Sequence, residues 1–126
     1  MYYDLLIRIK NGLAARKETV QAPFSEFDFS IAKFLQGAGY LAAVDKRVSG
    51  KKSSLEIRLK YEDNEPAITD FRLMSKPGRR IYIGYRDLTS VKQGHGIAVI
   101  SSPEGIVSNR EARKKKLGGE YLFQVW

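Results

Sequence analysis

Cysteine is absent from this chain of 126 residues, and histidine occurs only once. The missing cysteine excludes disulfides, thiolate metal sites and cysteine nucleophiles. A single histidine excludes a multi-histidine zinc site. We therefore expect no metal and no cofactor. No apolar run approaches the ~18–20 residues of a membrane span, and the apolar N-terminus lacks a signal-peptide cleavage pattern. These absences predict a cytoplasmic protein that does not enter a membrane.

Hydrophobic residues, by contrast, make up 43% of the chain and aromatic residues 11%. A chain of this length and composition folds around a real core, as one domain or as two small ones. It carries 22 Lys and Arg against 14 Asp and Glu, which leaves a net charge of +8. Such a surplus makes a polyanion the first partner to consider.

The positive charge is unevenly distributed along the chain. Residues 1–74 contain 12 basic and 10 acidic residues, whereas residues 75–126 contain 10 basic and 4 acidic residues. The second part is shorter but holds three-quarters of the surplus. We therefore expect the anion-facing surface to lie there.

The first part alternates helical and extended patterns. Apolar residues at helical spacing predict helices over 2–15 and from Ser25 to Gly37. Ser25 and Asp28 resemble a capping box, and Phe24 is placed to pack on Phe29. Strands are expected over 19–22, 40–48, 55–61 and 67–74. This order predicts an α/β unit with its helices on one face of a small sheet.

The segment Ser75-Lys76-Pro77-Gly78 is the strongest break in the chain. We expect a domain boundary there, with an α/β domain over 1–74 and a mainly β domain over 75–126. In the second domain, strands are expected over 79–83, 97–100 and 121–126, with a turn through 101–105. Ser108 and Glu111 form a second capping-box pattern that opens one short helix. The overall prediction is an α+β fold.

An enzyme would have to use His95, the only side chain that titrates naturally near neutrality. Gly94 and Gly96 flank it, but they precede a strand rather than a helix, so they do not form a dinucleotide fingerprint. No Ser and Asp pair suggests a nucleophile system with His95. We expect a non-catalytic protein, in which these glycines permit a tight turn.

The second part combines residue types that suit folded RNA: cations for phosphates, small hydroxyls and exposed backbone for base edges and 2′-hydroxyls, and an aromatic ring for stacking. The RNA-binding residues that we predict are Lys76, Arg79, Arg80, Tyr82, Ser101, Ser102, Arg110, Lys115, Gly118, Gly119 and Glu120. Other interpretations remain open. The serines also suit turns and caps, and cations at the end of a helix interact favourably with its dipole.

Three stretches carry a resemblance to a known family. Residues 94–107, followed by Ala112 and by Leu117-Gly118-Gly119-Glu120, resemble the C-terminal signature of the bacterial family of the eighth small-subunit ribosomal protein. Residues 75–82 resemble that family's Ser-Arg-Pro-Gly turn with its following Arg and Tyr. Arg8-Ile9-Lys10-Asn11 is similar to its N-terminal Arg-Ile-Arg-Asn. The similarity covers nearly the whole chain in the right order.

The resemblance implies a two-domain protein that binds the central domain of small-subunit ribosomal RNA and nucleates its assembly. It also implies contacts with neighbouring ribosomal proteins, feedback repression through its own messenger RNA, and a monomer outside the ribosome. The family's RNA contacts map to Ser101, Ser102, Gly118, Gly119 and Glu120, with Arg8, Lys10 and Asn11 as secondary contacts.

The chain departs from the family pattern at three places. Ser102 stands where Thr is usual, Ile7 replaces a Thr, and the customary Asp-Pro lead-in is missing. The last two departures put N-terminal RNA contacts in question. An alternative function of a different class is a basic, non-catalytic interaction module for an acidic protein partner.

Overall fold

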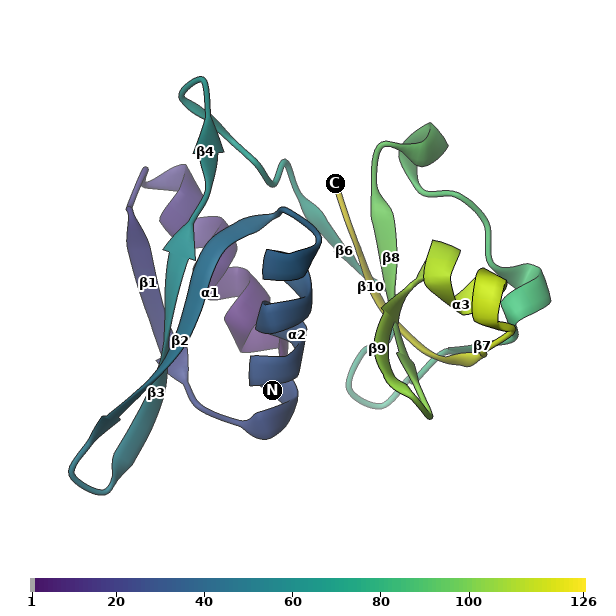
Figure 1. Ribbon diagram of the computed structural model, residues 1–126, viewed down its shortest axis with the longest axis horizontal. Coiled ribbons are helices and arrows are strands. Elements are labelled where there is room, and N and C mark those ends of the chain that lie inside the picture. Colours follow the sequence, from purple (N-terminus) through teal and green to yellow (C-terminus); the bar gives the residue numbers. More distant parts are fainter. Residues whose placement is uncertain (1) are drawn as a thin grey trace. The chain divides into compact units, whose positions relative to one another are not determined.

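The computed structural model describes residues 2–126 and divides the chain into two compact units (Figure 1). The first unit ends at Ile68, and the second runs from Thr69 to Trp126. The α+β class predicted from the sequence is confirmed.

The first unit is an α/β layer with elements α1 (Tyr2–Ala14), β1 (Thr19–Pro23), α2 (Glu26–Gly37), β2 (Leu41–Ser49) and β3 (Lys52–Leu59). Its antiparallel sheet has the strand order β1-β3-β2. Figure 1 shows α1 and α2 on the same face of that sheet. A separate short hairpin is formed by β4 (Tyr61–Glu62) and β5 (Glu65–Pro66).

The helical spacing of apolar residues in α1 determines which face is buried. Leu5, Leu6, Ile9 and Leu13 are buried on that face. Gly12 lies on it as well, and a Cβ at this position would come within 2.3 Å of a methyl carbon of Val20. Glycine at this position therefore permits close packing of α1 against β1.

Helix α2 begins as the capping pattern predicts. The Ser25 hydroxyl accepts a hydrogen bond from the Asp28 backbone N–H at 3.1 Å. The Phe24 and Phe29 rings pack with their centroids 5.8 Å apart, in the manner of a hydrophobic staple. Burial raises the pKa of the Asp28 carboxyl.

The strand predicted over 55–61 is confirmed as most of β3, and its side chains alternate between buried and more exposed. Leu55, Ile57 and Leu59 are buried beneath the helices, while Arg58 is exposed. The strand ends at Leu59, however, and Tyr61 belongs to β4. The chain reverses direction between β4 and β5 through Asp63 and Asn64, which both have positive φ.

The second unit is built around a curved antiparallel sheet. Its strands are β6 (Phe71–Leu73), β7 (Tyr82–Ile83), β8 (Ile97–Ser102), β9 (Gly105–Ser108) and β10 (Gly119–Val125). The order is β6-β10-β8-β9, and β7 also pairs with β10. Helix α3 (Asn109–Lys115) and two short 3-10 turns, η1 (Tyr85–Asp87) and η2 (Lys92–Gly94), complete the unit.

One hydrophobic cluster of this unit lies between the sheet and α3. Ile100, Val107 and Tyr121 are buried there together with Ala112 of α3. Ser108 caps α3 by accepting a hydrogen bond from the Glu111 N–H at 3.1 Å, as its sequence pattern predicts. The helix ends at Lys116 in the left-handed conformation, just before Gly118 and Gly119.

Two predicted strands are shorter in the structure than expected, and the division between the units falls elsewhere. Residues 67–74 contain only the short strand β6, and residues 79–83 contain only β7. Strand β6 pairs with β10, which places residues 69–74 in the second unit rather than the first. The observed division therefore falls six residues before the break predicted at Ser75. Strand pairing decides this, because the local sequence of β6 does not identify its partner.

Candidate nucleic-acid interface

One transverse row of the second sheet contains the central residues of the predicted site. Tyr82 of β7 pairs with Glu120 of β10, and Glu120 pairs on its other side with Ser101 of β8. Ser101 in turn pairs with Ile106 of β9. Residues in one row of a sheet point to the same face, so three predicted RNA contacts from distant parts of the sequence lie side by side.

The row faces away from the core that α3 covers. The adjacent row joins Ile100 to Tyr121 and to Val107, which all belong to that core. Because successive side chains of a strand alternate between faces, Ser101 and Glu120 project to the opposite face. Tyr82 is 71% exposed, which leaves its ring available to a partner.

Glu120 is the electrostatic centre of the row. Its side chain is only 14% exposed, and Oε1 lies 3.4 Å from a guanidinium nitrogen of Arg80, whose side chain is 49% exposed. The other carboxylate oxygen, Oε2, is buried and has no hydrogen-bond partner among residues 2–126. A buried carboxylate oxygen is a strong acceptor, and leaving it unpaired is costly. Because surrounding atoms cover this oxygen, the Glu120 side chain must move before an N–H or O–H donor of a partner can reach it.

The two serines behave differently. The Ser102 hydroxyl donates to the Gly105 carbonyl at 2.8 Å and accepts from the Glu104 N–H at 3.2 Å, so it closes the β8–β9 turn. The Ser101 hydroxyl has no hydrogen-bond partner within the part of the chain that the structure describes. Both serines lie in β8, and β9 begins at Gly105. The turn predicted over 101–105 therefore consists only of Pro103 and Glu104. Ser101 is the hydroxyl that remains available.

Gly118 and Gly119 bring backbone segments into close contact. A Cβ at Gly119 would lie 2.1 Å from the Ser101 carbonyl oxygen, and one at Gly118 would lie 2.8 Å from the Ile83 carbonyl oxygen. Any side chain at Gly119 would therefore force β10 away from β8. We interpret the glycine pair as the feature that holds the row Tyr82–Glu120–Ser101 together.

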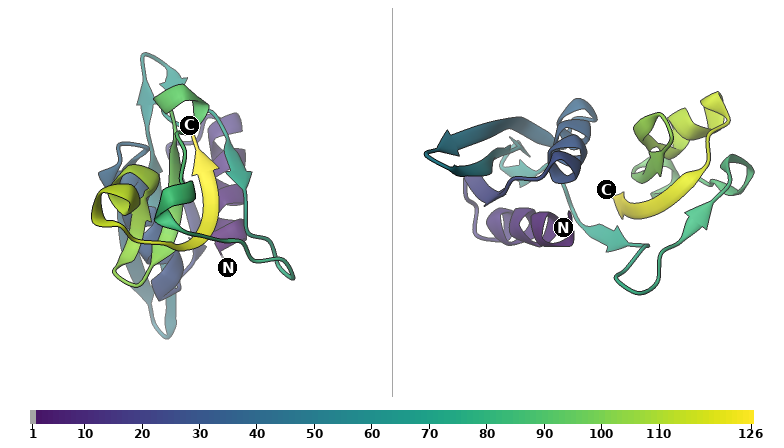
Figure 2. Two further views of the ribbon diagram at one scale, coloured as in Figure 1. Left: turned by 90° about the vertical axis from the view of Figure 1, so that its right-hand side faces the viewer. Right: turned by 90° about the horizontal axis from the view of Figure 1, so that it is seen from below.

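Ser75 anchors the basic turn beside this row, a role that the sequence does not reveal. Its buried hydroxyl accepts from the Ile81 N–H at 2.9 Å and donates to the Tyr121 carbonyl at 2.8 Å. Between these anchors, Lys76 and Arg79 exchange two backbone hydrogen bonds of 2.9 Å around Pro77-Gly78. The turn extends from the sheet (Figure 2, left), and Lys76, Arg79 and Arg80 are exposed on it.

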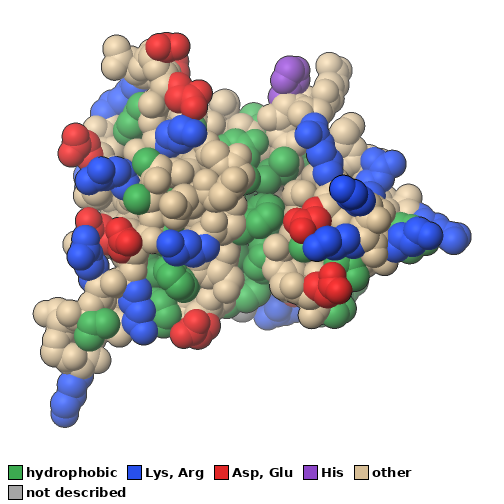
Figure 3. All heavy atoms as spheres, viewed as in Figure 1, with side chains coloured by type: hydrophobic (Ala, Val, Ile, Leu, Met, Phe, Trp, Pro, Cys, Tyr) green, Lys and Arg blue, Asp and Glu red, His purple; other side chains and the backbone are tan. Residues whose placement is uncertain are grey.

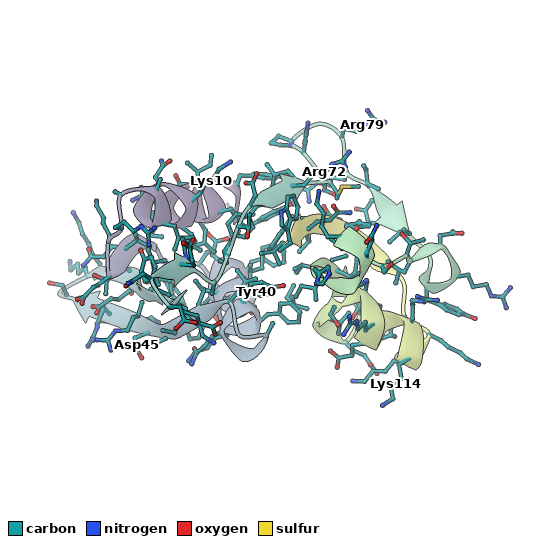
Figure 4. All side chains as sticks on the ribbon, turned by 90° about the horizontal axis from the view of Figure 1, so that it is seen from above. Lys10, Tyr40, Asp45, Arg72, Arg79 and Lys114 are labelled. Atoms are coloured by element: carbon teal, nitrogen blue, oxygen red, sulfur yellow. The ribbon has the colours of Figure 1, made fainter. Side chains whose placement is uncertain are left out.

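The basic residues of α3 form a separate cluster. Figure 3 shows Lys and Arg side chains gathered over this part of the second unit, with acidic side chains among them. Lys115 pairs with Glu111 at 3.1 Å, and Arg110 donates to the Gly94 carbonyl at 3.0 Å. In Figure 4, Arg79 and Lys114 point away from each other on opposite sides of the unit. The predicted cations therefore do not converge on one pocket.

The secondary residues lie in the first unit, exposed on α1. Arg8 donates to the Asp4 carboxylate at 2.8 Å and to the Gln21 carbonyl at 3.1 Å, so it joins α1 to β1. Arg8 and Asn11 line an open groove between those two elements, and Lys10, labelled in Figure 4, is also exposed.

The His95 side chain takes part in no hydrogen bond or ion pair among residues 2–126. His95 is exposed, and its backbone N–H bonds to the Lys92 carbonyl in η2. Residues 2–126 contain no group of three or more His, Asp or Glu side chains placed to hold a metal ion. No helix in the described chain is long and apolar enough to cross a membrane.

Comparison with known proteins gives a consistent result. The model of the family described as "Ribosomal protein S8" matches residues 2–126. The chain is 43% identical to the small ribosomal subunit protein uS8 of Erythrobacter litoralis, over 98% of this chain and 94% of that protein. It is also 43% identical to the proteins of that name from Nostoc punctiforme and Persephonella marina, over 98% of this chain and 94% and 95% of theirs.

Proposed function

Because the chain belongs to the ribosomal protein S8 family, a family of non-enzymatic components of the small ribosomal subunit, we propose that it binds the central domain of small-subunit ribosomal RNA and nucleates assembly there. The protein works in the cytoplasm, on the ribosome. We place the primary RNA-binding surface on the second unit. The observation that supports this placement is the row Tyr82–Glu120–Ser101.

The row suits an irregular RNA helix better than a regular one. The deep, narrow major groove of A-form RNA is closed to side chains, so specific recognition relies on unpaired or extruded bases. Tyr82 supplies an exposed ring for stacking. Ser101 supplies a hydroxyl for base edges or a 2′-hydroxyl. Glu120 accepts from a base amino group once its covered Oε2, which has no partner in the described chain, turns toward the RNA.

The surrounding cations supply affinity without sequence information. Lys76, Arg79 and Arg80 flank the row, and Arg110 and Lys115 lie on α3. Lys and Arg that neutralise phosphates release counterions, and this makes binding salt-dependent. Because the two groups of cations lie on different sides of the unit, we propose that they contact separate stretches of the RNA backbone.

The same surface suits a second RNA. A messenger that folds into a similar irregular stem presents the same bases to the Tyr82–Glu120–Ser101 row, so we propose that the protein represses its own messenger. Unlabelled ribosomal RNA then competes with that messenger for one site. We also propose that the protein contacts neighbouring ribosomal proteins in the small subunit and that it is a monomer outside the ribosome.

The experiment compares two variants of the full chain on a small-subunit ribosomal RNA transcript and on a scrambled RNA of equal length. Ser101→Tyr places a bulky ring in the row, and selective binding should be lost while non-specific binding remains. Lys115→Ala should weaken binding to both RNAs by about 1 kcal/mol or less and should lower the salt slope by about 1. Equal losses on the two RNAs for both variants would contradict the proposal. If the chain instead binds an acidic protein, and nuclease treatment does not disrupt that binding, the alternative function as a protein-interaction module is favoured.

A further inference from the structure

The hairpin that joins β2 to β3 carries an unpaired basic tip in the first unit. Residues 46–52 contain Lys46, Arg47, Lys51 and Lys52 and no acidic residue, and all seven are exposed. The chain turns through Gly50 and Lys51, with Gly50 at φ +62°. Positive φ at the first central residue alone is typical of a type II′ turn. The tip is therefore a defined structure rather than a flexible basic loop.

The tip extends beyond the rest of the sheet. Strand β1 pairs with β3 only as far as the pair Pro23 and Ser54, so residues 48–53 have no third strand beside them. Figures 1 and 3 show this hairpin projecting from the first unit, with basic side chains at its end. A projecting two-stranded hairpin can enter a groove or follow a backbone without a clash from the body of its unit.

Only half of the charge on the tip is engaged within the protein. Arg47 pairs with Glu56 at 3.0 Å, and the Lys46 ammonium lies 4.2 Å from the centre of the Phe24 ring. Lys51 and Lys52 have no acidic partner within residues 2–126. Two neighbouring, uncompensated ammonium groups repel each other, and a polyanion relieves that repulsion.

An open hollow of about 540 Å³ lies at the base of the hairpin. Its lining residues are mostly polar: Arg8, Gln21, Ala22, Pro23, Ser49, Lys52, Ser53 and Ser54. Arg8 and Lys52 thus border one concavity from different elements, together with three serines. Cations and hydroxyls in this combination are the groups that contact phosphates and sugars in nucleic-acid complexes.

The chemistry of this surface favours RNA over a protein partner. The buried centres of protein interfaces are rich in aromatic residues, Met and Arg and are depleted in Lys and Ser. The tip has one exposed apolar side chain, Val48, at 65% exposure. Lysines and serines around this hollow instead match a chain of phosphates and 2′-hydroxyls.

We propose that the β2–β3 hairpin and the hollow at its base form a second RNA-backbone surface, in which Arg8, Lys51 and Lys52 bind phosphates and Ser49, Ser53 and Ser54 contact ribose or phosphate oxygens. This inference rests on the proposed RNA binding by the second unit and adds a second point of contact with the same RNA. We expect this surface to contact mainly the RNA backbone, because Lys, Arg and Ser side chains commonly bind phosphate and sugar oxygens.

The first test removes the two free lysines. The variant Lys51→Ala/Lys52→Ala is compared with Lys33→Ala/Lys60→Ala, which removes the same charge from the same unit away from the hairpin. Binding to a small-subunit ribosomal RNA transcript is measured at several salt concentrations. The hairpin variant should bind about 3- to 10-fold more weakly and lower the salt slope by about 1–2, whereas the control should change little. Identical behaviour of the two variants would overturn the inference.

The second test uses the absence of cysteine from the chain. Val48→Cys creates a single attachment point at the tip for an iron chelate that cleaves nearby RNA, and Lys33→Cys serves as the control on α2. Cleavage of one defined segment from the tip, different from any segment cut from α2, supports the inference. Absence of cleavage from the tip argues against it. The inference is also contradicted if a variant of the tip binds RNA normally but no longer associates with other small-subunit proteins.

Ser101→Tyr on the same transcript separates the two proposals. If Ser101→Tyr removes selective binding and the hairpin variant matches its control, the hairpin inference fails while the proposed function stands. If neither variant alters binding to this RNA, the proposed function fails as well.

Discussion

Ser101 and Glu120 lie directly opposite each other on the adjacent strands β8 and β10, although they are separated by α3 in the sequence. One contributes a free hydroxyl and the other a nearly buried carboxylate with an unpartnered oxygen in the described chain. The close approach of Gly119 to the Ser101 carbonyl permits this pairing. The proposed RNA-reading surface therefore depends on a glycine whose role is steric.

The first prediction concerns Gly119→Ala. The new methyl group would lie 2.1 Å from the Ser101 carbonyl oxygen, so β10 must shift away from β8. We expect a loss of about 1–3 kcal/mol in the free energy of unfolding, as for other overpacked sites, together with loss of selective RNA binding. Urea denaturation and RNA titration measure the two effects. Gly37→Ala at the end of α2, where a Cβ meets nothing within 4 Å, is the matched control and should not be destabilised.

Ser75→Ala tests the anchor of the basic turn. The substitution leaves the Ile81 N–H and the Tyr121 carbonyl without their hydroxyl partner in a buried position. Groups left unsatisfied in this way cost about 1–3 kcal/mol each. We expect a lower urea midpoint and faster amide exchange at Ile81. Ser90→Ala, at an exposed position, should leave both unchanged. An unaltered exchange rate at Ile81 in Ser75→Ala would show that the hydroxyl does not hold the turn.

Tyr82→Ala separates RNA binding from stability. The ring is 71% exposed, so its removal should change the free energy of unfolding by less than about 0.5 kcal/mol. Stacking of a base on an aromatic ring contributes about 1–3 kcal/mol to binding, and that amount should be lost. Tyr82→Phe keeps the ring and should retain most of the affinity. Equal affinities for the Ala and Phe variants would exclude stacking on this residue.

Asp28 gives a prediction about pH. Burial raises the pKa of its carboxyl in the folded state above the ordinary value for an aspartate. Ionisation therefore opposes folding: the penalty is absent below the unfolded pKa and grows as pH rises through the folded pKa. Near pH 3 the urea midpoints of Asp28→Asn and the parent should differ little. Between about pH 4 and pH 7 the variant should become progressively more stable than the parent. Urea midpoints of both proteins across this range test the sign, and a difference that shrinks with rising pH would contradict it.

Local patterns were sufficient to predict much of the fold. The spacing of Leu6, Ile9 and Leu13 predicts α1, Ser25 and Ser108 predict the starts of two helices, and alternation around Ile57 predicts β3. Each of these signals depends on residues within one or two turns of each other. Such local signals predict longer strands than β6 and β7 turn out to be. The length of both strands is set by their pairing with β10, which is distant in the sequence.

The candidate site shows the same division. Residue types alone identified Tyr82, Ser101 and Glu120 as candidates, but not their common row. The sequence does not reveal the role of Ser75, because a serine before Lys-Pro-Gly is an ordinary turn residue. Its function depends on the hydrogen bond from its hydroxyl to the distant Tyr121 carbonyl. The difference between Ser101 and Ser102 likewise required the geometry of the β8–β9 turn.

The sequence by itself determined that this protein is basic, free of cysteine and biased in charge toward its second part, and that it resembles a ribosomal family. These properties are set by composition and by short motifs. Only the tertiary structure decided that Tyr82, Glu120 and Ser101 share one face, that the predicted cations form separate clusters, and that Lys51 and Lys52 project on a hairpin. Strand register and side-chain pairing join residues that are distant along the chain, and no local pattern specifies which distant residues will meet.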